Sequence, residues 1–152
     1  MLYSHPHGNV FYRTMNHKRP MIAYGEGIYL FDDSGKRYID GSGGPLVVNV
    51  GHGRTEIVEA MTKQAAAAAY VHAIMFTSEP LETYAAELAA VVLIPEPRFY
   101  FLSSGSEVVE GAIKLARQIQ IARGQEKRHI ILSRWQSYHG MTLGALAVSG
   151  RA

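Results

Sequence analysis

The residues best suited to chemistry stand in a turn that joins a short apolar run to a helical pattern. Residues 103–106 read Ser-Ser-Gly-Ser, and helical spacing begins directly after them. Unpartnered N–H groups at a helix start, together with the helix dipole, attract anions. Gly105 leaves room for close approach, and Ser104 and Ser106 add hydroxyl donors, so this turn suits a phosphate group. The alternative is an ordinary serine cap, and the four residues alone leave both interpretations open.

A second turn carries an aromatic ring and an imidazole. Tyr138, His139 and Gly140 follow the apolar run at residues 129–132. Open α/β sheets bind ligands at the carboxyl ends of their strands, so this turn is expected on the same rim as residues 104–106. Tyr138 could stack there on a flat heterocycle. The alternative, which local evidence alone favours, is that Tyr138 packs inside the protein and His139 caps a loop.

The elements that must position these turns can be predicted from spacing and turn residues. Residues 1–20 predict an extended arm or a loop. The β-prone runs at 28–31 and 36–40 around an Asp-Ser-Gly turn predict a hairpin. Residues 41–45 predict a flexible connector, and residues 46–48 a short buried strand or extended piece. Helical spacing predicts three helices, one from Thr55, one from Ser78 to the prolines at 95 and 97, and one from residue 105 to Gly124.

Two apolar runs, at residues 99–102 and 129–132, predict strands that are buried on both faces. The order strand, helix, strand predicts a right-handed parallel crossover. The sequence therefore predicts an α/β fold with helices layered on a parallel sheet.

Composition narrows the classes of function. The chain has 152 residues with 47% apolar and 18% charged side chains, which is enough apolar material for a core. A net charge of +2 gives no argument for nucleic acid or membrane, and the absence of cysteine excludes disulfides, thiolate nucleophiles and Cys-ligated metals. His5 and His7 lack a third ligand, so no metal is expected. No apolar run reaches membrane-spanning length, and we expect a cytoplasmic protein.

In their order and spacing, four stretches together resemble class III aminotransferases, which are fold-type I enzymes that use pyridoxal 5′-phosphate. They are residues 25–40 (Gly-x-Gly-x-Tyr-Leu-x-Asp-x-x-Gly-x-x-Tyr-Ile-Asp), 49–53 (Asn-Val-Gly-His-Gly), 103–117 (Ser-Ser-Gly-Ser-Glu-x-x-Glu-x-Ala-x-Lys-x-Ala-Arg) and 138–142 (Tyr-His-Gly-x-Thr). Residues 48–51 and 134–140 are most similar to the ω-transaminase branch.

The resemblance implies roles for the two turns. The N–H groups of Gly105 and Ser106, with the Ser106 hydroxyl, would hold the phosphate of pyridoxal 5′-phosphate, and Ser104 would line the same turn. Tyr138 would stack on the pyridine ring, and His139 would lie beside it.

Other positions follow from the same resemblance. Leu46, Ile74 and Met75 lie where the branch places substrate-pocket side chains, and Leu46 replaces an aromatic residue. Glu107 and Glu110 are also family positions, which we interpret as residues that support the helix and its surroundings. The family's Schiff-base lysine and its ring-binding aspartate would come after Ala152, so no catalytic residue is expected within this chain.

The resemblance implies a domain organisation and a function for the whole. Residues 1–50 would be the arm and hairpin, part of the small domain, and residues 51–152 the first, truncated part of the large cofactor-binding domain. The expected function is transfer of an amino group from an amine or amino acid to a keto acid or aldehyde by a homodimer. These residues would be only its N-terminal portion, inactive alone. The alternative is a non-catalytic module of the same fold that binds a phosphate ligand or a partner.

Overall fold

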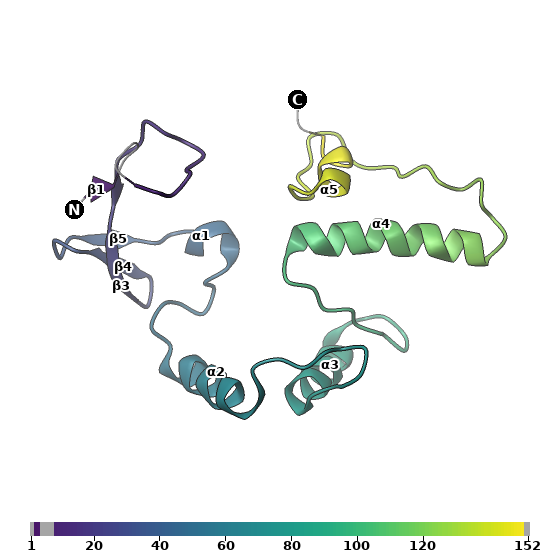
Figure 1. The fold of residues 1–152 in the computed structure, drawn as a ribbon, viewed down its shortest axis with the longest axis horizontal. Coiled ribbons are helices and arrows are strands. Elements are labelled where there is room, and N and C mark those ends of the chain that lie inside the picture. The colour runs from purple at the N-terminus through teal and green to yellow at the C-terminus, as the bar shows by residue number, and fades with distance from the viewer. Residues whose placement is uncertain (1, 4–7, 151–152) are drawn as a thin grey trace. The chain divides into compact units, whose positions relative to one another are not determined.

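The computed structural model describes residues 2–3 and 8–150, and the chain forms two compact units, Met1–Thr77 and Ser78–Ala152 (Figure 1). The first unit contains β1 (Leu2–Tyr3), β2 (Arg19–Pro20), β3 (Ile22–Glu26), β4 (Tyr29–Asp32), β5 (Arg37–Ile39), α1 (Gly43–Leu46) and α2 (Thr55–Ala68). The second unit contains α3 (Glu79–Val91), α4 (Gly105–Ala122) and α5 (Leu143–Ala147). No helix among the described residues is both long enough and apolar enough to span a membrane.

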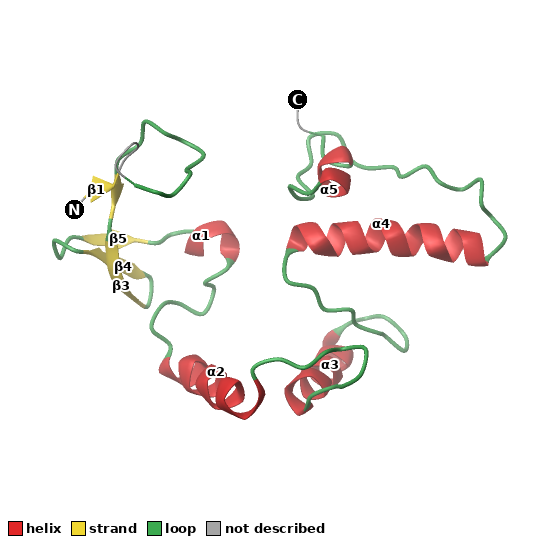
Figure 2. Cartoon of the chain, viewed as in Figure 1, coloured by secondary structure: helices red, strands yellow, loops and turns green. Residues whose placement is uncertain are grey.

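An antiparallel sheet of three strands, in the order β3-β4-β5, dominates the first unit (Figure 2). Its β4–β5 part confirms the predicted hairpin, with Tyr29 opposite Ile39. The sequence did not predict β3, which has a register shift after Ile22. The stack of Tyr24 on Phe31, with ring centroids 4.5 Å apart, stabilises this register across the two strands. A separate antiparallel pair joins β1 to β2.

Asp32 closes the β4–β5 turn and is one of the few buried residues. One carboxylate oxygen accepts from the Ser34 hydroxyl at 2.6 Å, the Ser34 N–H at 2.9 Å and the Lys36 N–H at 3.0 Å. The other oxygen accepts from the Tyr38 hydroxyl at 2.8 Å. Hydrogen bonds from Ser34 and Tyr38 hold the pKa of Asp32 well below its usual range, and the bond to Asp32 raises the pKa of Tyr38.

The segment after the hairpin differs from its prediction. Residues 46–48 form neither a strand nor a buried extended piece, because α1 is a kinked helical turn in which Gly44 and Leu46 have positive φ. The N–H groups of Val47 and Val48 both bond to the Gly43 carbonyl, which leaves them unavailable to a strand partner. Leu46 and Val47 are exposed.

The three predicted helices are confirmed. Helix α2 begins at Thr55, α3 begins after Ser78 with a proline in its first turn, and α4 ends shortly before Gly124. Gly124 has φ 68°, the left-handed conformation that favours glycine at a helix end. The short helix α5 was not predicted, since five residues carry little periodic signal.

The two predicted buried strands are absent from the described chain. Residues 99–102 and 129–132 are irregular, and no backbone hydrogen bond joins them there. A strand needs a neighbour for its N–H and C=O groups, and neither segment has one among the described residues. Tyr100, Ile130 and Leu132 are consequently exposed, at 78%, 77% and 92%.

Little of the described chain is buried. Among residues 8–150, only Asp32, Gly140 and Ala145 are buried. The apolar content that predicts a core is therefore not assembled into one, and most large apolar side chains face outward. Two of the three buried residues lie where the segment after α4 returns to the start of that helix (Figure 1).

Candidate functional site

The start of α4 has the geometry of an anion site. Ser104 is the N-cap, and its hydroxyl accepts from the Glu107 N–H at 3.3 Å. The serine-cap interpretation therefore holds for Ser104. Within the part of the chain that the structure describes, the N–H groups of Gly105 and Ser106 have no hydrogen-bond partner, as expected in a first helical turn. A Cβ added at Gly105 would meet no atom within 4 Å, so the space beside Gly105 is open.

Ser106 connects the two turns that the sequence singled out. Its hydroxyl oxygen accepts the Met141 N–H at 3.0 Å, across 35 positions of the chain. A hydroxyl has two acceptor lone pairs and one proton, so Ser106 can still donate its proton to an anion. Residues 104–106 and 138–140 thus lie beside each other, as the sequence predicted.

Gly140 is buried against the start of α4. A Cβ at Gly140 would lie 2.6 Å from the Ser106 hydroxyl oxygen and 2.8 Å from the Ala145 Cβ. These distances leave no space for any side chain, and φ at Gly140 is 139°. The glycine therefore lets the backbone of the 138–140 turn touch α4 directly.

Glu110 makes a second contact between α4 and the returning chain. Its carboxylate, which is half-buried, accepts the Gly144 N–H at 2.7 Å. The buried Thr142 hydroxyl lies beside the same carboxylate but has no well-formed hydrogen bond among the described residues. The hydrogen bond from the Gly144 N–H is therefore the contact that joins Glu110 to the returning chain. The Thr142 hydroxyl first and the Gly144 N–H second lower the pKa of Glu110, which keeps it ionised.

The turn that carries Tyr138 and His139 is also fixed from its other side. The His139 N–H donates to the Ser149 hydroxyl at 2.9 Å, and that hydroxyl donates to the Ala145 carbonyl at 2.7 Å. The Gly150 N–H donates to the Ser137 carbonyl at 3.1 Å. His139 lines a groove of about 440 Å³ between α4 and residues 131–134, and Tyr138 is half-exposed at 55%.

The residues present fit a phosphate monoester. Two free N–H groups, the hydroxyl of Ser106 and open space beside Gly105 meet at one helix start. An aromatic ring follows in the adjacent turn, which suits a phosphate attached to a flat ring. Among the described residues, no lysine side chain donates a hydrogen bond to residues 104–106, and a helix start needs none to attract an anion.

The substrate-pocket candidates lie in the first unit. Leu46 is in α1 with φ 62° and is 74% exposed. Ile74 and Met75 lie in a turn after α2, where the Met75 N–H donates to the His72 carbonyl at 2.9 Å. Both are exposed, at 88% and 74%.

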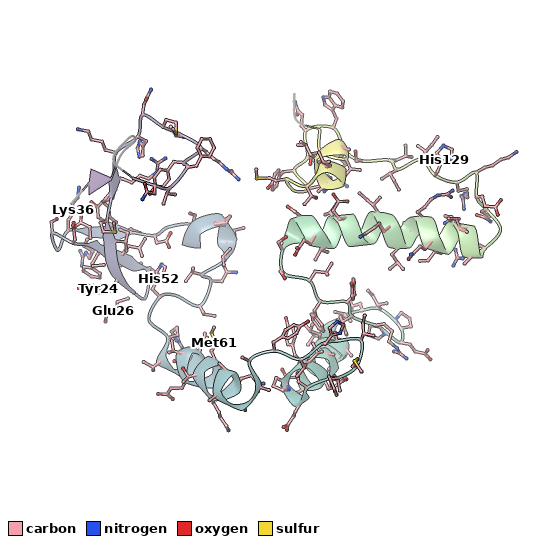
Figure 3. All side chains as sticks on the ribbon, viewed as in Figure 1. Tyr24, Glu26, Lys36, His52, Met61 and His129 are labelled. Carbon is pink, nitrogen blue, oxygen red and sulfur yellow. The ribbon has the colours of Figure 1, made fainter. Side chains whose placement is uncertain are left out.

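A hydrogen-bonded pair, Asp40 and His52, joins the two ends of the segment that carries Leu46, and the sequence alone did not reveal it. His52 Nε2 lies 2.8 Å from Asp40 Oδ2, and His52 is the main cause of the lowered pKa of Asp40. The N–H of His52 donates to the Gly27 carbonyl at 2.7 Å, and a Cβ at Gly25 would lie 2.7 Å from the His52 side chain. Figure 3 shows His52 beside the sheet. The two glycine-rich motifs, 25–27 and 51–53, thus pack together, a contact that their shared small residues could have suggested.

Metal ligation receives no geometric support. His5 and His7 lie outside the described residues. In the ranges that are described, no three His, Asp or Glu side chains are close enough to hold an ion.

A family model for class III aminotransferases matches residues 12–152. The chain belongs to this family. An uncharacterized aminotransferase of Bacillus subtilis, YodT, is 42% identical over 131 residues, which are 86% of this chain and 30% of that protein.

Solved structures of this family agree with the described backbone. An (S)-enantioselective omega-transaminase from Thermomicrobium roseum matches with a TM-score of 0.86 and 39% identity over 97% of this chain and 33% of its own. The omega transaminase of Pseudomonas jessenii in complex with PMP matches with a TM-score of 0.88 and 25% identity over 95% of this chain and 33% of its own.

These matches confirm the fold class and the family predicted from the sequence. The fold is the first part of the fold-type I α/β architecture, and the cofactor of the family is pyridoxal 5′-phosphate. The chain spans about a third of the length of the relatives it matches. Residues 99–102 and 129–132 therefore fall within a transaminase backbone although they pair with no strand among the described residues.

Proposed function

We propose that this chain forms the phosphate side of the active site in a pyridoxal 5′-phosphate-dependent aminotransferase. The observation that carries the proposal is the contact between the two turns, in which Ser106 at the open start of α4 bonds to Met141 beside Tyr138 and His139. Family membership supplies the cofactor that this geometry fits.

Each residue of the two turns has one task in this proposal. The N–H groups of Gly105 and Ser106 and the Ser106 hydroxyl bind the phosphate, while Ser104 holds the first helical turn in shape. Tyr138 stacks on the ring and His139 lies beside it. When bound, the cofactor supplies an electron sink that allows an amino group to pass from an amine or amino acid to a keto acid or aldehyde.

We assign the remaining parts of the function to a larger assembly. The complete enzyme is these 152 residues together with the part of the fold that the relatives have and this chain does not span. That part holds the catalytic lysine and aspartate. We propose that residues 1–50 belong to its small domain and residues 51–152 to its large domain, and that it is a cytoplasmic homodimer.

In this proposal, residues of the first unit determine which substrates the enzyme accepts. Leu46, Ile74 and Met75 line the substrate pocket, and Leu46 replaces the aromatic residue of the ω-transaminase branch. The positive φ of Leu46 supports a functional role, because such strain is concentrated at ligand sites.

The test is the affinity of the complete enzyme for pyridoxal 5′-phosphate, measured by equilibrium dialysis on the Gly105→Val, Ser106→Ala double variant. Valine fills the open space, and alanine removes a donor to a charged group, so binding should weaken at least about tenfold. Ser78→Ala is the matched control, since Ser78 caps α3 without a side-chain hydrogen bond. Unchanged affinity in the double variant would refute the phosphate site. Cofactor binding without any amino transfer would favour the non-catalytic module.

A further inference from the structure

Four residues form two matched contacts where the returning chain meets α4. Ser106 and Glu110 are four positions apart on α4, so they lie on one face of the helix. Gly140 and Gly144 are also four positions apart, and neither has room for a Cβ. Ser106 occupies that space at Gly140, and Glu110 occupies it at Gly144. Ser106 meets Gly140 and the Met141 N–H, and Glu110 meets Gly144 and accepts its N–H.

The two α4 residues differ in whether they also bind the ligand in the proposed function. The Ser106 hydroxyl also serves the phosphate in the proposed function. Glu110 has no such second task in that proposal, since its carboxylate accepts the Gly144 N–H. In the proposed function, the contact between Glu110 and Gly144 therefore involves no atom of the ligand.

We infer that Glu110 is a positioning residue for the cofactor ring. By holding the 142–144 backbone against α4, it fixes the distance between the phosphate-binding turn and the turn that carries Tyr138. This inference rests on the proposed function and goes beyond it, because Glu110 touches neither the phosphate nor the ring in that proposal.

Preorganisation is the physical reason for an effect on binding. A ligand with a phosphate and a ring must meet both turns at once, and any freedom of one turn relative to the other is lost on binding. A ligand that is only a phosphate meets residues 104–106 and gains nothing from a fixed second turn. Glu110 should therefore matter for pyridoxal 5′-phosphate and not for inorganic phosphate.

The test compares these two ligands in the complete enzyme. In Glu110→Ala, we expect affinity for pyridoxal 5′-phosphate to fall about tenfold and affinity for inorganic phosphate to change less than about twofold. Glu110→Gln keeps an oxygen for the Gly144 N–H, so it should restore most of the loss. Hydrogen exchange of the Gly144 amide in the ligand-free protein should quicken in the alanine variant and not in the glutamine variant. Glu87→Ala, a loss of an exposed carboxylate on α3, is the matched control.

Each outcome has a distinct meaning. Unchanged affinity for pyridoxal 5′-phosphate in Glu110→Ala overturns the inference. A parallel loss of both ligands without rescue by glutamine overturns it too, because that pattern is a general loss of structure. If the alanine variant does not fold, Glu110→Asp replaces it, since the shortened side chain retreats from the Gly144 N–H. A wild-type protein that binds no pyridoxal 5′-phosphate refutes the proposed function itself, and the wild-type measurement alone identifies that case.

Discussion

At the scale of single residues, the site depends on places where the backbone must approach another chain segment closely. Ser106, Gly140 and Glu110 are each defined by a contact more than thirty positions away or by the absence of room for a Cβ. Residue types with turn or cap propensity at 104–106 and 138–140 were visible in the sequence. The contact between Glu110 and Gly144 was not, since no local pattern pairs those positions.

Gly140→Ala tests the closeness of the two turns. The added methyl would overlap the Ser106 hydroxyl and the Ala145 Cβ, so we expect about 1–3 kcal/mol of destabilisation of the complete enzyme and weaker cofactor binding. Urea unfolding measures the first effect. Gly41→Ala is the control, because a Cβ at Gly41 would meet no atom within 4 Å. Equal stabilities for the two variants would contradict the described packing.

Leu46→Trp tests the proposed substrate pocket. An indole at this position would occupy space that a leucine leaves open, so kcat/KM for bulky arylalkyl amines should fall about tenfold while that for alanine stays within about twofold. Steady-state kinetics of the complete enzyme with both donors decide the matter. A uniform loss for both donors would place Leu46 outside the pocket.

At the scale of elements, the sequence predicted the helices and the hairpin, which form mainly through interactions between residues near each other in the chain. The hairpin, α2, α3 and α4 all follow from turn residues, caps and helical spacing. The runs at 99–102 and 129–132 are apolar enough for strands, but a strand is completed by its neighbours, and the described residues supply none. The kinked α1 and the short α5 depend on positive φ and on tertiary contacts, which spacing alone does not encode.

The pH dependence of the hairpin follows from Asp32 and Tyr38. The pKa of Asp32 is lowered by folding, so its contribution is complete above its unfolded pKa, about 3.9, and is lost as the pH falls below that value. The pKa of Tyr38 is raised, so its contribution is complete below about pH 10 and is lost as the pH rises further. The protection factors of the β4–β5 amides, which compare their exchange rates with those of the unfolded chain at the same pH, should therefore be highest between these limits.

The variant Tyr38→Phe separates the two limbs of that profile. This variant should no longer lose hairpin stability at alkaline pH. It should still lose stability at acid pH, because Ser34 and Lys36 still donate hydrogen bonds to the Asp32 carboxylate. An alkaline limb that persists in Tyr38→Phe would show that another group is responsible.

At the scale of the whole molecule, exposure is the dominant property. Large apolar side chains on β3, β5 and all five helices stay open to water, and only Asp32, Gly140 and Ala145 are buried among residues 8–150. The chain spans about a third of the length of its relatives, so about two thirds of their length lies outside the matched region.

The 152-residue chain alone should therefore self-associate and should not catalyse amino transfer. Exposed apolar faces and unpaired segments favour aggregation. Sedimentation velocity across a range of concentrations, with an amino-transfer assay on alanine and an aldehyde, measures both properties. A monomer that turns over substrate would contradict this expectation.

The central claim is that residues 104–106 bind the cofactor phosphate beside the turn at 138–142. Hydrogen exchange of the complete enzyme, resolved to short peptides and measured with and without pyridoxal 5′-phosphate, tests it most directly. The unpartnered amides of Gly105 and Ser106 should become the most strongly protected on addition of the cofactor, with lesser protection across residues 138–144. Protection confined to other parts of the enzyme, with these two amides unchanged, would contradict the claim.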